Sequence, residues 1–80
     1  MAIKVRIRGH ADARVVEDRP GEWTVQVYGA QVGTVWMDGP GDYRYATKRT
    51  TCGDDEVEYE LEGAVEALVR RWWRERLEAS

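Results

Sequence analysis

Residues 23 to 36 read WTVQVYGAQVGTVW, and this stretch decides the fold. Apolar and polar residues alternate on both sides of a central glycine, as is typical of two half-buried strands joined by a tight turn. We expect a type II′ loop at Gly29 and Ala30, because the first central position of that loop favours glycine. This register places Trp23 opposite Trp36 on one buried face. The same face then holds Val25, Val27, Val32 and Thr34.

Further strands are predicted on both sides of this hairpin. Residues 3 to 8 alternate apolar and basic side chains, and a second extended piece covers residues 14 to 17. Residues 19 to 22, RPGE, have proline and glycine at the two central positions of a type II turn. Another strand is expected over residues 43 to 48.

The end of the chain shows a helical period from about Glu62 to Leu77. Trp73 and Leu77 lie on the flank of the apolar stripe, so we expect them to remain as exposed apolar surface. The stripe itself consists of Leu61, Ala64, Val65, Leu68, Val69 and Trp72.

Residues 54 to 62 fit both a strand and an extension of the helix, and a short strand ending near Glu60 is favoured. The predicted fold is α+β: a curved antiparallel sheet of four or five strands packed on one C-terminal helix. Eighty residues allow one domain, spanning residues 1 to 80.

Composition excludes several classes of protein. No apolar run approaches the ~18 residues that a membrane span needs, and charges alternate at the N-terminus, so a cytoplasmic protein is expected. The single cysteine, Cys52, excludes an internal disulfide and a metal site made of cysteine pairs. Ten arginines against two lysines, with no phenylalanine or asparagine, indicate a high-GC bacterial genome, such as an actinobacterial one, or a bacteriophage genome.

Catalytic residues are scarce. The chain has one histidine, His10, and one serine, Ser80 at its end, so a nucleophile, a base and an orienting group are not available together. The acidic block 54 to 62 does not match the spacing of a calcium-binding loop. We therefore expect a non-enzymatic protein without a cofactor or a metal ion.

A DNA-binding module is the alternative function. Basic and hydrogen-bonding side chains could align on the polar face of the sheet, which strands can use to read a groove. A three-stranded sheet followed by a helix, over residues 22 to 72, resembles the DNA-binding modules of plant AP2-type factors and integrase arm-binding domains in topology. The candidate contact residues are Lys4, Arg6, Arg8, Gln26, Tyr28, Arg44 and Lys48.

Two features weigh against DNA. The net charge is −3, with six carboxylates in residues 54 to 62. Helix cations are also expected in i,i+4 ion pairs. These pairs are Glu66 with Arg70, Arg71 with Glu75, and Arg74 with Glu78.

The leading hypothesis is an accessory or regulatory protein that binds another protein, such as a phage or high-GC bacterial modulator of a host complex. Trp and Arg are enriched at interface hot spots, and an exposed sheet edge adds the alternative of a homodimer. The candidate contact residues are Trp73, Leu77, Arg70, Glu56, Glu58 and Glu60.

Overall fold

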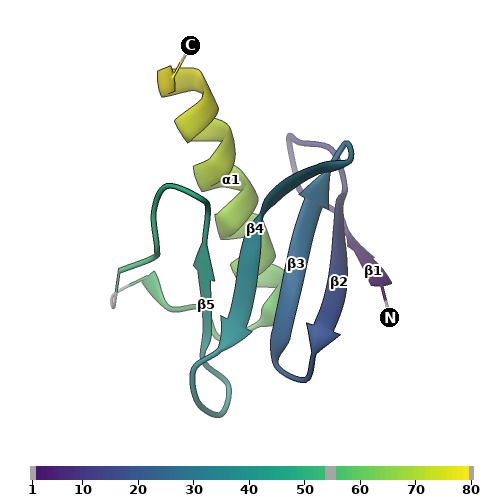
Figure 1. The fold of residues 1–80 in the computed structure, drawn as a ribbon, viewed down its shortest axis with the longest axis vertical. Coiled ribbons are helices and arrows are strands. Elements are labelled where there is room, and N and C mark those ends of the chain that lie inside the picture. The colour runs from purple at the N-terminus through teal and green to yellow at the C-terminus, as the bar shows by residue number, and fades with distance from the viewer. Residues whose placement is uncertain (1, 54–55, 80) are drawn as a thin grey trace.

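The computed structural model describes residues 2 to 53 and 56 to 79 and shows an open five-stranded antiparallel sheet packed against one C-terminal helix (Figure 1). The strands follow one another in the sheet in chain order, so each pairs with its sequence neighbours. This confirms the predicted α+β class. The elements are β1 (Ala2–Val5), β2 (Ala13–Arg19), β3 (Glu22–Val27), β4 (Ala30–Met37), β5 (Tyr43–Ala46) and α1 (Leu61–Ala79).

Helix α1 packs on one face of the sheet, mainly over β4 and β5 (Figure 1). The predicted apolar stripe is confirmed, since its residues are buried or packed against the core. Gly33 lies beneath the helix: a Cβ atom there would stand 2.1 Å from the Ala46 carbonyl oxygen and 3.0 Å from Cδ1 of Leu68. Glycine is therefore what lets β4 approach β5 and α1 this closely. The described residues include no helix with both the length and the apolar character that a membrane crossing requires.

The hairpin between β3 and β4 turns one residue earlier than expected. Tyr28 and Gly29 form the loop, with φ of 53° and 77°. Positive φ at both central residues is the requirement of a type I′ turn, whose twist matches that of the flanking strands. The predicted loop at Gly29 and Ala30 is therefore wrong. A bulge then leaves Val32 as an extra residue on β4, so Val25 pairs with Gly33.

This register separates the two tryptophans that were expected to share a face. Trp23 pairs with Val35 and packs against the core, where its ring lies 5.9 Å from that of Tyr43. Trp36 pairs with Glu22 and Arg44 and points to the other side of the sheet. The correction follows from the period of two, because a shift of one residue turns a strand's side chains to the opposite face.

The predicted strand near Glu60 is also absent from the described residues. Glu58 makes only an isolated bridge to Tyr43, and α1 begins at Leu61. Residues 54 and 55 of the acidic block lie outside the described residues. Backbone bonds from Cys52 and Glu58 occupy the outer edge of β5, which therefore needs no further strand. Gly63 lies in the first turn of the helix.

Candidate functional site

The antiparallel order divides the loops between two ends of the molecule. The loops that follow β1, β3 and β5 lie at the end toward which α1 runs, and the turns after β2 and β4 lie at the other (Figure 1). We call the first the aromatic end, because several rings and one leucine gather there. It consists of His10, Tyr28, Trp72, Trp73 and Leu77.

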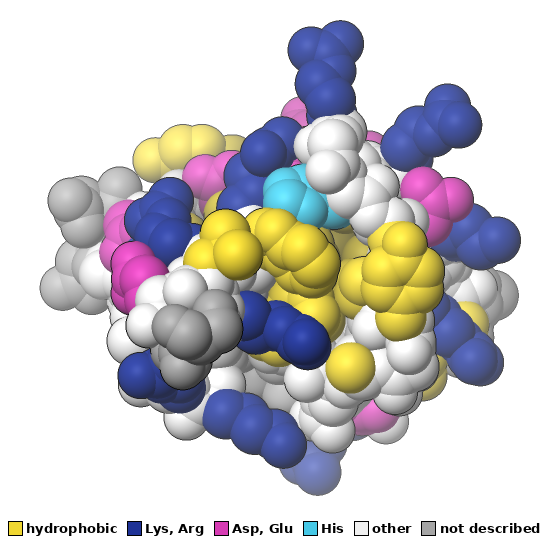
Figure 2. All heavy atoms as spheres, turned by 90° about the horizontal axis from the view of Figure 1, so that it is seen from above, with side chains coloured by type: hydrophobic (Ala, Val, Ile, Leu, Met, Phe, Trp, Pro, Cys, Tyr) yellow, Lys and Arg dark blue, Asp and Glu magenta, His cyan; other side chains and the backbone are white. Residues whose placement is uncertain are grey.

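Two hollows flank Trp72 at this end. The first, of about 380 Å³, lies between the β1–β2 loop, the β3–β4 turn and the helix, and its walls include His10, Tyr28 and Trp73. The second, of about 290 Å³, lies between the loop after β5 and the helix, with Lys48 among its lining residues. Figure 2 shows this end from above: yellow apolar side chains lie beside the cyan His10, with dark blue Lys and Arg side chains around them.

Ring contacts hold the aromatic residues of the helix in place. The edge of the His10 ring meets Trp73 at 5.8 Å between centroids, and Trp72 lies 5.7 Å from Trp73. The Arg76 guanidinium stands 4.8 Å from the centroid of Trp72 and 5.9 Å from that of Trp73. Cation–π contacts of this kind contribute about 0.5 to 1 kcal/mol at exposed sites. The two indoles are therefore oriented before any partner arrives.

Tyr28 is held in an unfavourable backbone conformation. Its φ of 53° is left-handed, and its side chain is 86% exposed. Left-handed backbone costs a bulky residue about 1 kcal/mol, and glycine or asparagine would fill this turn position at less cost. The fold gains almost no burial from the ring. A strained, exposed aromatic residue is a reason to look for a role outside folding.

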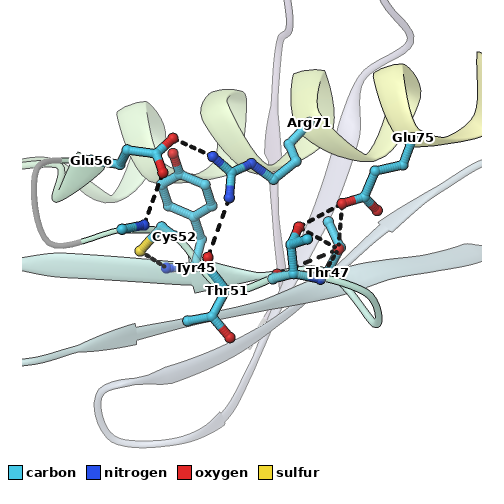
Figure 3. A network of polar contacts seen from close by, with 9 residues as sticks. Tyr45, Thr47, Thr51, Cys52, Glu56, Arg71 and Glu75 are labelled. Atoms are coloured by element: carbon cyan, nitrogen blue, oxygen red, sulfur yellow. Dashed lines mark hydrogen bonds and ion pairs between the residues drawn. The ribbon is translucent and has the colours of Figure 1, made fainter. Parts of the chain in front are cut away.

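Two sets of polar contacts fasten the loop after β5 to the helix (Figure 3). The hydroxyl groups of Thr47 and Thr50 donate hydrogen bonds of 3.0 and 2.6 Å to Oε2 of Glu75. Further along, Arg71 forms an ion pair with Glu56 and donates a bond of 3.4 Å to the carbonyl oxygen of Thr51. The loop tip at Lys48 and Arg49, between the two threonines, is thus fixed beside the second hollow.

The contacts around Arg71 also shift the pKa values of the groups that take part in them. The hydrogen bond from Arg71, with a backbone bond from Gly53, lowers the pKa of Glu56. The hydrogen bond to Glu56 in turn raises the pKa of Arg71. Burial, followed by the charge of Glu56, raises the pKa of Tyr45. All three groups keep one protonation state near neutral pH, so this cluster is suited to fastening the loop and not to proton transfer.

The helix cations are only partly paired as expected. Glu66 and Arg70 form the predicted i,i+4 ion pair at 2.9 Å. Arg71 pairs with Glu56 instead of Glu75, which binds the two threonines. Among the described residues Arg74 forms no ion pair. More of the helix's positive charge is therefore available than the sequence spacing indicates.

Acidic residues gather at the opposite end of the molecule, which we call the acidic end. Glu58, Glu60 and Glu62 surround the start of α1, and Asp38 and Asp42 lie in the turn after β4. The helix dipole favours carboxylates at a helix start and cations near its end. It does not account for the cations that loops bring to the aromatic end. The ends of the molecule therefore differ in charge, although Met37 and Tyr59 are exposed apolar side chains of the acidic end.

The residues expected to contact a protein partner are divided between these ends. Trp73 and Leu77, which are 39% and 65% exposed, lie together at the aromatic end. Arg70 is ion-paired to Glu66 and donates a bond of 3.3 Å to the Arg8 carbonyl oxygen. The expected glutamates lie elsewhere: Glu56 against Arg71, and Glu58 and Glu60 at the acidic end.

The residues expected to contact DNA are divided as well. Lys4, Gln26 and Arg44 do lie on the sheet face opposite α1, which we call the outer face and which no described element covers. Arg6, Arg8, Tyr28 and Lys48 lie beyond the strand ends. Arg14 was not among the outer-face candidates, and Thr34 and Trp36 were expected on the buried face, but the register puts all three on the outer face.

Nothing in the described residues forms a cluster of three or more His, Cys, Asp and Glu side chains that could hold a metal ion. Cys52 is buried, and its sulfur accepts a long bond of 3.5 Å from the Tyr45 N–H. No known protein family, curated protein or solved structure matches this chain.

Proposed function

We propose that this protein is a small non-enzymatic regulatory protein of the cytoplasm that binds a partner protein through its aromatic end. The observation that supports the proposal most is the exposure of Tyr28 and Trp73 on the walls of one hollow, with Leu77 exposed one helical turn beyond Trp73. Tryptophan, tyrosine and arginine are the residues most enriched at interface hot spots, and they act best where a pocket is already formed.

These three side chains are not part of the buried core. Each keeps much of its apolar area in water, with exposed fractions of 86% for Tyr28, 39% for Trp73 and 65% for Leu77. The core under the helix is complete without them, since the fully buried side chains of α1 belong to earlier residues such as Val65, Leu68 and Val69. Exposed apolar side chains that line a hollow, as Tyr28 and Trp73 do, favour an interaction site.

Capture from a lysate of the source cells tests this function. The wild-type protein, Trp73→Ser and Tyr59→Ser are compared as baits, with and without nuclease. Tyr59 is the matched control, because it is 78% exposed and lies at the acidic end. We expect wild type and Tyr59→Ser to retain the same protein after nuclease treatment and Trp73→Ser to lose it. Equal capture by all three baits would remove the aromatic end from the proposal.

A DNA-binding role for the outer face is the second candidate. Cross-strand pairing aligns Lys4, Arg14 and Gln26 in one row, and Trp36 lies beside Arg44 in another. This set can contact phosphates and base edges. It ranks second because Arg44 is ion-paired to Asp38 at 2.7 Å and the chain's net charge is negative.

Duplex binding at low salt is the measurement for this candidate. Binding that falls steeply as salt rises, and that weakens in a Lys4→Ala/Arg14→Ala variant, would support it. If no complex forms with generic duplex at low salt, the outer face loses this role.

A further inference from the structure

We propose that the segment bound at the aromatic end is acidic and inserts an apolar side chain between Tyr28 and Trp73. This inference rests on the proposed protein-binding function and adds the chemistry of the partner. It follows from three features of the aromatic end: its apolar hollow, the cations around it, and the charge of the rest of the molecule.

The first hollow suits an apolar anchor. Val27, Val69 and Trp72 form its floor, and the rings of His10, Tyr28 and Trp73 also line it. Its volume of about 380 Å³ accommodates one or two apolar side chains without rearrangement of the core. An aromatic or leucine side chain buried there would be shielded from water on several sides, which is the environment in which anchors contribute most to affinity.

Cations from three separate elements lie at the aromatic end, and Lys48, Arg49 and Arg76 line the second hollow. Arg8 belongs to the β1–β2 loop and Lys48 and Arg49 to the loop after β5, and none of them forms an ion pair among the described residues. Arg76 of α1 lies over the two indoles. We call these four residues the cationic rim.

Few acidic side chains lie near the cationic rim. Glu75, which lines the second hollow, accepts hydrogen bonds from Thr47 and Thr50. Asp12 and Glu78 are the other acids of this end. The aromatic end is thus locally positive on a chain whose net charge is −3. A positive patch of this kind attracts an acidic partner and orients its approach.

A second copy of the chain fits this surface less well than a separate partner. The acidic end does present Tyr59 between Glu58 and Glu60, which is the chemistry that the aromatic end accepts. That contact would be head to tail, so the assembly would stay open unless the rotation between copies closed it into a ring. A partner with its own acidic segment gives a finite complex.

Selection from a random peptide library displayed on phage tests the inference. The library is selected on the wild-type protein after depletion on Trp73→Ser. We expect enriched peptides with aspartate or glutamate on both sides of a leucine or an aromatic residue. One enriched peptide is then measured by fluorescence anisotropy beside its version with the acids changed to amides. The acidic form should bind about tenfold more tightly, and salt should reduce that difference.

Variants of the protein show which charges act. Lys48→Ser/Arg49→Ser should weaken the acidic peptide severalfold and leave the amide version unchanged, whereas Arg19→Ser, at the acidic end, should change neither. Far-UV circular dichroism checks that each variant is folded.

Four other outcomes of these experiments would contradict the inference. Enriched peptides that are neutral or basic, but still depend on Trp73, would overturn the acidic chemistry and leave the protein-binding function standing. No enrichment that depends on Trp73 would overturn both. Tighter binding of a thymidine oligonucleotide than of the peptide, lost in Trp73→Ser, would assign the surface to nucleic acid. Concentration-dependent sedimentation abolished by both Trp73→Ser and Tyr59→Ser would identify a second copy as the occupant instead.

Discussion

The two halves of helix α1 differ in what they do for the protein. From Leu61 to Val69 the helix packs on β4 and β5, and its inward residues are buried. From Arg70 onward it extends past the sheet toward the loops of the aromatic end, where Trp73 and Leu77 remain exposed (Figure 1). One continuous helix thus serves folding with its first half, and its second half carries part of the binding surface that we propose. Stability and binding should therefore respond to different substitutions.

Two leucines nine residues apart give the largest expected contrast. Leu68→Ala removes a fully buried side chain over Gly33, so it should lower the free energy of unfolding by about 3 kcal/mol. Leu77→Ala, at a side chain 65% exposed, should change it by less than about 0.5 kcal/mol. Urea unfolding measures both. Similar losses in the two variants would show that the second half of the helix also belongs to the core.

Trp73→Ser should produce an intermediate effect on stability and a large one on binding. The substitution removes the ring contacts with His10 and Trp72, each of which contributes about 1 kcal/mol, but leaves the buried core in place. Partner capture should be lost at a temperature where unfolding is negligible. A loss of several kcal/mol would instead identify Trp73 as a core residue.

The ion pair between Glu56 and Arg71 should make the stability of the protein sensitive to acid. Arg71 lowers the pKa of Glu56, so this pair stabilises the fold above the ordinary pKa of 4.5 and its contribution is lost as pH falls through the lower folded value. Between about pH 6 and pH 3 the wild type should lose more stability than Glu56→Gln. Glu60→Gln, whose carboxylate has no ion pair among the described residues, should follow the wild type. Parallel curves for all three proteins would contradict a stabilising Glu56–Arg71 pair.

The smallest expected effect has the opposite sign. Tyr28→Asn introduces a residue that tolerates positive φ better than tyrosine, so it should stabilise the hairpin by about 0.5 kcal/mol. The same substitution removes a ring from the first hollow and should weaken partner binding. Thermal unfolding and capture together test this. A destabilised variant with unchanged capture would mean that the tyrosine serves the turn itself.

Sequence patterns predicted the parts of the fold that depend on local periodicity. The helical stripe, the turn at Pro20 and Gly21, and the exposure of Trp73 and Leu77 follow from the spacing of apolar residues and from backbone preferences, and the structure confirms them. The hairpin register could not be read in this way. Both possible loops contain Gly29. The residues that approach Gly33 closely, Ala46 and Leu68, are far from it in sequence, so no local pattern reveals this contact.

The candidate site was predictable only in part for the same reason. The i,i+4 rule predicts the ion pair of Glu66 with Arg70. Arg71 instead forms an ion pair with Glu56, and Glu75 accepts a hydrogen bond from Thr47, which are contacts between distant segments. His10 and Tyr28 reach the helix end because the sheet order brings their loops there, which no local pattern encodes. The clearest available signal was Gly29 itself, since glycine at the second central position of a two-residue loop between strands is typical of a type I′ turn.

The four tryptophans allow the most direct test of the claim that the aromatic end is the binding surface, because Trp23 is in the core, Trp36 on the outer face, and Trp72 and Trp73 at the aromatic end. The measurement is the set of indole N–H signals in ¹H–¹⁵N NMR spectra as the captured partner is added. We predict that the signals of Trp72 and Trp73 shift while those of Trp23 and Trp36 stay. A shift of Trp36 with Trp72 and Trp73 unchanged would place the partner on the outer face and contradict the account.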